Sequence, residues 1–242
     1  MSKQNKLIFF LSTGRSGTKW LAKNFDAVYG DVARVVHEPV PLKKRLGLCY
    51  LKSVRDPAFC EEVYPDIASW AQLIDRTLNE KSFIWTGWDC YSLIPYFVHK
   101  LGRDRVSVVA LRRSWQNHLA SLLRSTFYDD NNFNIGQHPT PLKNEHLYPT
   151  DPDFMGLTTQ DRKSWYMAEI IAYGDFLRKT YPNLHFFNFF IDHVFNSSRL
   201  EMKSLIRFME LDWREEFFER STIKEDSVIF NNSRGLDVNL LT

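Results

Sequence analysis

A five-residue apolar run that ends in a glycine turn constrains the fold of this chain more than any other sequence feature. Residues Leu7–Leu11 are all apolar, which predicts a strand buried on both faces. Polar residues and glycines fill positions 12–17, and apolar residues then recur at helical spacing over residues 21–28. A strand, a tight glycine turn and a helix in this order are typical of the start of an α/β domain.

The remainder of the chain continues this alternation of strands and helices. Further interior strands are predicted for residues 83–85, 106–111 and 185–191, and helices for residues 66–78, 115–123, 158–176 and 200–209. The predicted apolar faces of these helices include Trp115, Leu123 and Leu200. We therefore expect one α/β domain over residues 1–242, with a mainly parallel sheet flanked by helices.

Composition excludes several other classes of protein. Of 242 residues, 44% are apolar and 25% are charged, which is ordinary for a globular domain and argues against wholesale disorder. A net charge of +2, from 31 basic and 29 acidic residues, is too small for a dedicated nucleic-acid binder. Three cysteines without a C-x-x-C pair indicate neither a disulfide framework nor a zinc site. With no apolar run long enough for a signal peptide or membrane span, we expect a cytoplasmic protein of unspecified oligomeric state.

One long segment, residues 126–156, follows neither the helical nor the strand period. It is polar and contains four prolines. Loops longer than about 12–15 residues in a compact domain are usually lids, binding loops or insertions. We predict a lid over a substrate, with a plain surface excursion as the alternative.

The glycine turn itself has the features of an anion site. Gly14 and Gly17 allow the backbone to bend tightly, and the N–H groups after Gly17 point out of a helix N-terminus, where the helix dipole attracts negative charge. The turn also supplies four side-chain donors, those of Arg15, Ser16, Thr18 and Lys19. These features predict binding of a phosphate or phosphosulfate; the alternative is a turn that only joins strand to helix.

The turn is not a Walker A motif. That motif, G-x-x-x-x-G-K-[ST], would require glycine at Ser12 and lysine at Thr18. The lysine–hydroxyl pair that contacts the γ-phosphate and Mg²⁺ is therefore missing. A nucleotide or small-molecule kinase with a variant loop is accordingly the weaker alternative.

The segment Arg15-Ser16-Gly17-Thr18-Lys19-Trp20-Leu21 resembles the 5′-phosphosulfate loop of sulfotransferases that use 3′-phosphoadenosine-5′-phosphosulfate (PAPS). That loop reads [KR]-S-G-T-[TS]-W-L, so the sequence departs from it only at Lys19. The resemblance implies a P-loop NTPase-like three-layer fold and a loop that wraps the 5′-phosphate and sulfate, with Arg15 on the transferring group. It also implies that Trp20 lies against the adenine, although core packing explains a tryptophan here equally well.

A second motif of that family places an arginine after a central strand and a serine eight residues later, both on the 3′-phosphate. Arg113 and Ser121 match this spacing, and the serine then lies two turns along the next helix. Arg112 is the spare charge, and the alternative is a solvated helix start. Near the end of the chain, Arg234 and Gly235 resemble the loop that closes over the 3′-phosphate.

Sulfuryl transfer requires a general base for the acceptor and cations for the leaving group. Arg15 and Lys19 are the cations, and no metal ion is expected. For the base we favour Glu38, since it follows a β-branched run and is therefore expected at a strand end in the second βα unit, next to the phosphate loop. Several branches of the family that the chain resembles use a carboxylate near this position. His37 is second, and extended backbone would point it to the opposite face from Glu38. The remaining candidates are Asp89, His138 and His146.

Together these features predict a sulfotransferase that moves a sulfuryl group from PAPS to a hydroxyl or amine of a small-molecule or carbohydrate acceptor. Adenosine 3′,5′-bisphosphate is then the product. The alternatives are the variant-loop kinase above and a non-catalytic nucleotide-binding protein. The sequence does not identify the acceptor.

Overall fold

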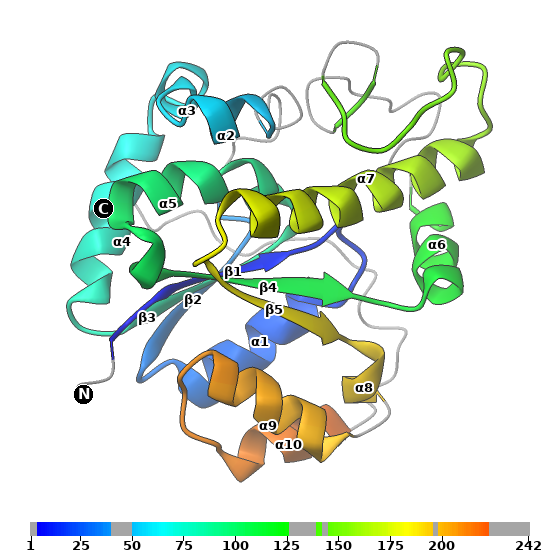
Figure 1. The fold of residues 1–242 in the computed structure, drawn as a ribbon. Coiled ribbons are helices and arrows are strands. Elements are labelled where there is room, and N and C mark those ends of the chain that lie inside the picture. Colours follow the sequence, from blue (N-terminus) through cyan, green and yellow to red (C-terminus); the bar gives the residue numbers. More distant parts are fainter. Residues whose placement is uncertain (1–3, 40–49, 126–138, 142–144, 196–197, 223–242) are drawn as a thin grey trace.

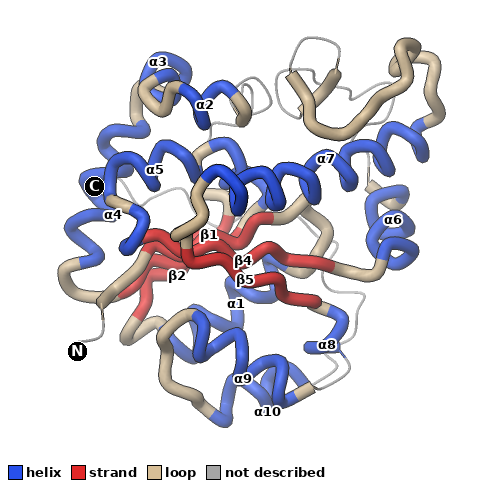
Figure 2. Tube along the Cα trace, viewed as in Figure 1, coloured by secondary structure: helices blue, strands red, loops and turns tan. Residues whose placement is uncertain are grey.

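The centre of the fold is a parallel β-sheet (Figures 1 and 2). The structure, a computed structural model, describes residues 4–39, 50–125, 139–141, 145–195 and 198–222. The strands are β1 (Leu7–Leu11), β2 (Ala33–His37), β3 (Ser82–Thr86), β4 (Val106–Arg112) and β5 (His185–Phe190). Within the described residues they pair in the order β2-β3-β1-β4-β5, and each pair is parallel. The predicted α/β class and parallel sheet are confirmed.

Helices cover both faces of this sheet, which gives three layers. One face is covered by α1 (Thr18–Tyr29), α9 (Arg199–Phe208) and α10 (Glu215–Thr222), and the other by α4 (Ile67–Leu78), α5 (Ile94–Leu101) and α7 (Thr159–Thr180) (Figure 1). Shorter elements are α2 (Lys52–Arg55), α3 (Phe59–Val63), η2 (Trp88–Ser92), η3 (Arg103–Arg105) and α8 (Asp192–Phe195). The helix α6 (Trp115–Leu123) lies beyond the end of β4. This is the P-loop-like architecture that was expected.

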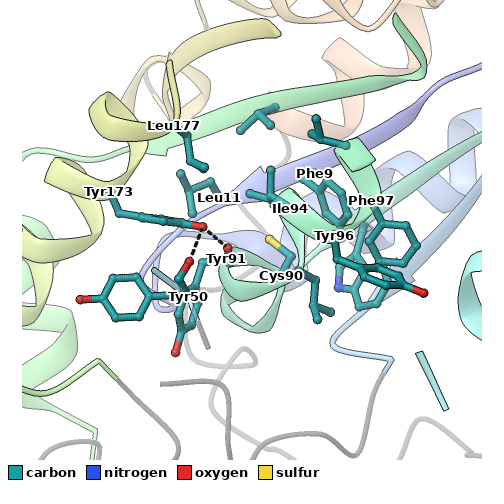
Figure 3. Close-up of a cluster of buried hydrophobic side chains, with 14 of the residues drawn as sticks. Phe9, Leu11, Tyr50, Cys90, Tyr91, Ile94, Tyr96, Phe97, Tyr173 and Leu177 are labelled. Carbon is teal, nitrogen blue, oxygen red and sulfur yellow. Dashed lines mark hydrogen bonds between the residues drawn. The ribbon is translucent and has the colours of Figure 1, made fainter. Parts of the chain in front are cut away.

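The apolar strands build a core on each side of the sheet. Phe9 and Leu11 of β1 belong to the apolar cluster beneath α4, α5 and α7, whereas Ile8 and Phe10 belong to the cluster against α1 and α9. Because side chains alternate along a strand, an all-apolar run fits a position with helices on both faces. Aromatic rings fill much of the first cluster, where the Tyr173 hydroxyl lies 2.9 Å from the Tyr91 carbonyl oxygen (Figure 3).

Two predicted helix faces are wrong in part: Leu122 of α6 and Ile206 of α9 are buried as expected, but other residues of these faces are exposed. Trp115 and Leu123 of α6 are 40% and 42% exposed, and Leu200 of α9 is 75% exposed. The buried side chains of α6 are His118, Ser121 and Leu122. The reason is that α6 packs at the polar carboxyl edge of the sheet, where polar side chains of the helix find partners that the apolar core does not offer.

The described part of the 126–156 segment is bonded to α7. The buried Glu169 carboxylate accepts hydrogen bonds from the backbone N–H groups of Leu147 and Tyr148. The start of α7 is capped by Thr158, whose hydroxyl accepts from the Asp161 N–H at 3.2 Å. A lid function for the segment stays a prediction, and residues 126–138 and 142–144 lie outside the described residues. Among the described helices, none combines the length and the apolar character needed to cross a membrane.

Candidate functional site

The polar residues singled out by the sequence gather at one edge of the sheet. Because all five described strands are parallel, the turn after β1 and the residues that follow β2, β3, β4 and β5 share the carboxyl edge. After β1 the chain passes to α1 on one face, and after the adjacent β4 it passes through α6 to α7 on the other. In open α/β sheets, ligands bind at such a reversal.

The turn after β1 has the backbone of an anion cradle. Gly14, Arg15 and Gly17 have φ angles of +79°, +54° and +83°, which place all three in the left-handed region. For Arg15 this costs roughly 1–2 kcal/mol, so the surrounding contacts must hold the turn in place. Left-handed residues within a turn direct successive backbone N–H groups into a concavity that suits anions.

The side chains of the turn fit a bound anion. Ser16 is fully buried, and its hydroxyl oxygen has no hydrogen-bond partner within the described part of the chain. A buried hydroxyl without a partner is costly, and an oxygen of a bound anion would complete its hydrogen bonding. Arg15 and Lys19 are exposed, so their charges are accessible at the surface. Trp20 is half-buried and packs against the apolar cluster around α1; an adenine contact for it stays a prediction.

His118 of α6 joins the turn to the neighbouring helix. Its Nε2 lies 3.0 Å from the Gly14 carbonyl oxygen and 2.6 Å from Thr13 Oγ1. The tautomer of a neutral imidazole is inferred from the hydrogen-bond partners of its nitrogens. Since a carbonyl oxygen only accepts, Nε2 of His118 carries the hydrogen. Burial lowers the pKa of His118 to about 4, so the ring is neutral at pH 7. Sequence reasoning missed this residue, although it lies three residues before Ser121 on the same helix face.

Arg113 of the second motif contacts the turn that carries the first motif. Its Nη1 donates to the Arg15 carbonyl oxygen at 3.2 Å, and its Nε lies 3.6 Å from Asp192 Oδ1. Asp192 also accepts from the Ser114 N–H at 2.6 Å, which fixes the carboxylate at the start of α6. Ser121 is buried on the same helix. Asp192, which no sequence pattern indicated, therefore holds Arg113 beside the turn.

Arg112 points away from this site. A Cβ at Gly174 of α7 would lie 3.3 Å from Arg112 Nη2, so this guanidinium lies against α7. Burial lowers the pKa of Arg112. Of the two adjacent arginines, only Arg113 reaches the turn among the contacts found in the described residues.

Glu38 and His37 form a pair at the end of β2. Glu38 has a φ of +46°, and its N–H donates to the Thr86 carbonyl oxygen at 3.0 Å. Because the backbone turns here instead of continuing as a strand, Glu38 Oε1 lies 3.8 Å from His37 Nε2. The extended backbone that would point the two side chains to opposite faces is therefore not present at Glu38.

The tautomer of His37 follows from its partners. Its Nδ1 lies 3.1 Å from the Thr86 carbonyl oxygen and 3.2 Å from Thr86 Oγ1. The Thr86 hydroxyl donates its own hydrogen to the Val36 carbonyl oxygen, so both Thr86 oxygens accept from Nδ1–H. In the neutral ring, Nε2 then presents its lone pair on the side of Glu38.

The Gly87–Trp88 dipeptide after β3 lies between this pair and the turn. A Cβ at Gly87 would lie 2.7 Å from Glu38 Cγ, and a Cβ at Gly14 would lie 3.5 Å from the Trp88 side chain. The next residue, Asp89, is buried, and its Oδ1 accepts from the Trp85 indole at 3.2 Å. The dipeptide thus contacts both Glu38 and the anion turn at the same edge of the sheet.

Of the other candidate residues, only His146 lies within the described part of the chain, and no contact found there joins it to this arrangement. His146 is exposed, and its ring lies 6.2 Å from the Trp165 ring. His138, Arg234 and Gly235 lie outside the residues that the structure describes.

Comparisons with known proteins assign no family to this chain. No protein-family model matches it, and a search of curated proteins found no match. The function is therefore inferred from the sequence motifs and the geometry of the carboxyl edge.

Proposed function

We propose that the protein is a sulfotransferase that transfers a sulfuryl group from PAPS to a hydroxyl or amine of a small-molecule or carbohydrate acceptor. The observation that carries this proposal is the 3.2 Å contact between Arg113 Nη1 and the Arg15 carbonyl oxygen. It joins two sequence motifs, 98 residues apart, in one site. Such a site suits a nucleotide with phosphate at both its 5′ and 3′ positions.

The turn supplies the groups that the 5′-phosphosulfate requires. Its backbone N–H groups and the Ser16 and Thr18 hydroxyls are donors for the phosphate and sulfate oxygens. Arg15 and Lys19, both exposed, neutralise the charge that develops on the leaving phosphate oxygen. Arg113 and Ser121 bind the 3′-phosphate, a group that ATP lacks.

Glu38 supplies the base. The acceptor oxygen or nitrogen attacks sulfur, the bond between sulfur and the phosphate oxygen breaks, and adenosine 3′,5′-bisphosphate leaves. The acceptor proton passes to the Glu38 carboxylate, and His37 Nε2, 3.8 Å away, stabilises the protonated group or receives the proton in turn. No step requires a metal ion.

The test uses two nucleotides and one transfer assay. Adenosine 3′,5′-bisphosphate without Mg²⁺ is expected to raise the melting temperature. At a ligand concentration of 100 times the dissociation constant, the free energy of unfolding rises by about 2.7 kcal/mol. Labelled sulfate from PAPS is expected to appear in one member of a panel of phenols, amines and sugars. A rise in melting temperature with ATP plus Mg²⁺, and none with the bisphosphate, would indicate a kinase. A shift with the bisphosphate but no transfer to any acceptor would indicate a binding protein.

Replacing Arg113 with alanine tests the 3′-phosphate assignment. We expect affinity for adenosine 3′,5′-bisphosphate to fall by about 1.5–3 kcal/mol, the range for a hydrogen bond to a charged group. Arg112→Ala is the matched control. It removes the same charge from the neighbouring position, where the arginine side chain lies against α7 and not beside the turn. Calorimetric titration of both variants measures the difference. Equal losses in the two variants would leave only a general charge effect and contradict the assignment.

A further inference from the structure

His118 contacts the anion turn through a backbone carbonyl group. Its Nε2–H donates to the Gly14 carbonyl oxygen at 3.0 Å, and Thr13 Oγ1 lies 2.6 Å from the same nitrogen. The ring is buried, so the contact is shielded from water. Nothing in the proposed chemistry requires this residue to touch the nucleotide or the acceptor.

The geometry of the peptide bond makes this contact important for the anion. All peptide bonds in the described chain are trans, and in a trans peptide the C=O and N–H groups point in opposite directions. Because His118 holds the Gly14 carbonyl, the Arg15 N–H of the same peptide unit points away from His118. The next peptide unit is held in the same way, since Arg113 holds the Arg15 carbonyl and turns the Ser16 N–H away from itself.

We propose that His118 is a positioning residue for the anion: it fixes the Gly14–Arg15 peptide so that the N–H group, and not the carbonyl oxygen, faces the ligand. A reversed peptide would place a negative carbonyl end where the anion binds and would repel it. The proposal depends on the proposed function only in requiring that the turn binds an anion. It does not depend on sulfuryl transfer.

The neutral state of the ring fits this role. The charged groups that face His118 are Arg113, at the end of β4, and Asp192, at the start of α8. Burial lowers the pKa of His118 to about 4, and this effect is larger than those of both neighbours. The ring therefore keeps one N–H donor at Nε2 throughout the physiological pH range.

The experiment compares glutamine and leucine at this position. A glutamine amide reaches the place of imidazole Nε2, so His118→Gln keeps the donor, whereas His118→Leu removes it. We expect His118→Leu to bind adenosine 3′,5′-bisphosphate and inorganic pyrophosphate about tenfold or more weakly, and His118→Gln to bind both within about threefold of wild type. Leu122→Ala, at a buried residue of the same helix, is expected to lower the melting temperature without changing either affinity. His118→Asn, whose amide is one bond shorter, is expected to behave like leucine and serves if the leucine variant does not fold.

The outcomes separate this inference from the proposed function. Loss of anion affinity in His118→Leu with rescue by glutamine, in a protein that transfers no sulfate, supports the inference and overturns the sulfotransferase proposal. Sulfate transfer by the wild type together with unchanged affinity in the leucine and asparagine variants overturns the inference alone. An equal loss in Leu122→Ala, or no binding of either anion by the wild type, also overturns it.

Discussion

Glu38→Gln is expected to reduce turnover by roughly 10²–10⁴-fold, the usual contribution of a general base, while affinity for adenosine 3′,5′-bisphosphate stays unchanged. The amide has the shape of the carboxylate but does not accept the proton that the acceptor loses. The backbone of residue 38 is held by the bond from its N–H to the Thr86 carbonyl oxygen, and the substitution leaves this bond intact. Single-turnover transfer of labelled sulfate measures the effect on the chemical step.

Two further variants delimit this result. Glu80→Gln makes the same change at an exposed residue before β3, at the opposite edge of the sheet, and is expected to keep wild-type turnover. His37→Gln is expected to reduce turnover less than Glu38→Gln, because it removes the neighbour of the base and not the base. If instead His37→Gln has the larger effect and Glu38→Gln the smaller, His37 is the base. Full turnover in both variants would remove the pair from the mechanism.

The sequence predicted the parallel sheet, and with it the edge at which several candidate residues lie, because both follow from local rules. The all-apolar run of β1 can only be buried on two faces, and parallel strands then place every strand end at one edge. The turn after β1, Glu38 after β2 and Arg113 after β4 therefore meet without any knowledge of long-range contacts. The eight-residue spacing of Arg113 and Ser121 also predicted that Ser121 lies two turns along the helix that follows β4.

Residues that act through long-range contacts were not predictable in this way. His118 bonds to Gly14, 104 residues earlier, and Asp192 bonds to Ser114, 78 residues earlier. Apolar periodicity predicted the inward face of α6 only in part. It identified the buried Leu122 but not His118 and Ser121, because it assumes that an inward helix face is apolar, whereas this face meets a polar turn. The pairing of His37 with Glu38 depends on a single positive φ angle, which the sequence does not reveal at a glutamate.

Gly87→Ala is expected to destabilise the protein strongly and to displace Glu38. Gly87 has a φ of +146°, and a side chain in such a conformation costs about 1–3 kcal/mol. A Cβ would also lie 2.6 Å from Asp89 Oδ1, 2.7 Å from Glu38 Cγ and 3.2 Å from the Glu38 backbone nitrogen. Relieving this overlap adds about 1–3 kcal/mol, as in other overpacked cores, and requires Glu38 to move.

Gly102→Ala separates the two costs. Gly102 has a φ of +87°, and a Cβ there would meet nothing within 4 Å, so this variant carries a conformational penalty without overlap. It lies before β4, away from the carboxyl edge. Urea unfolding of both variants is expected to show a larger loss of unfolding free energy for Gly87→Ala, and transfer assays at low temperature are expected to show lost turnover only there. The overlap involves the side chains of both Asp89 and Glu38, and also the Glu38 backbone nitrogen, so Glu38 is expected to move. A Gly87→Ala variant that loses stability but keeps full turnover would mean that Glu38 moves without consequence. The base would then lie elsewhere at this edge.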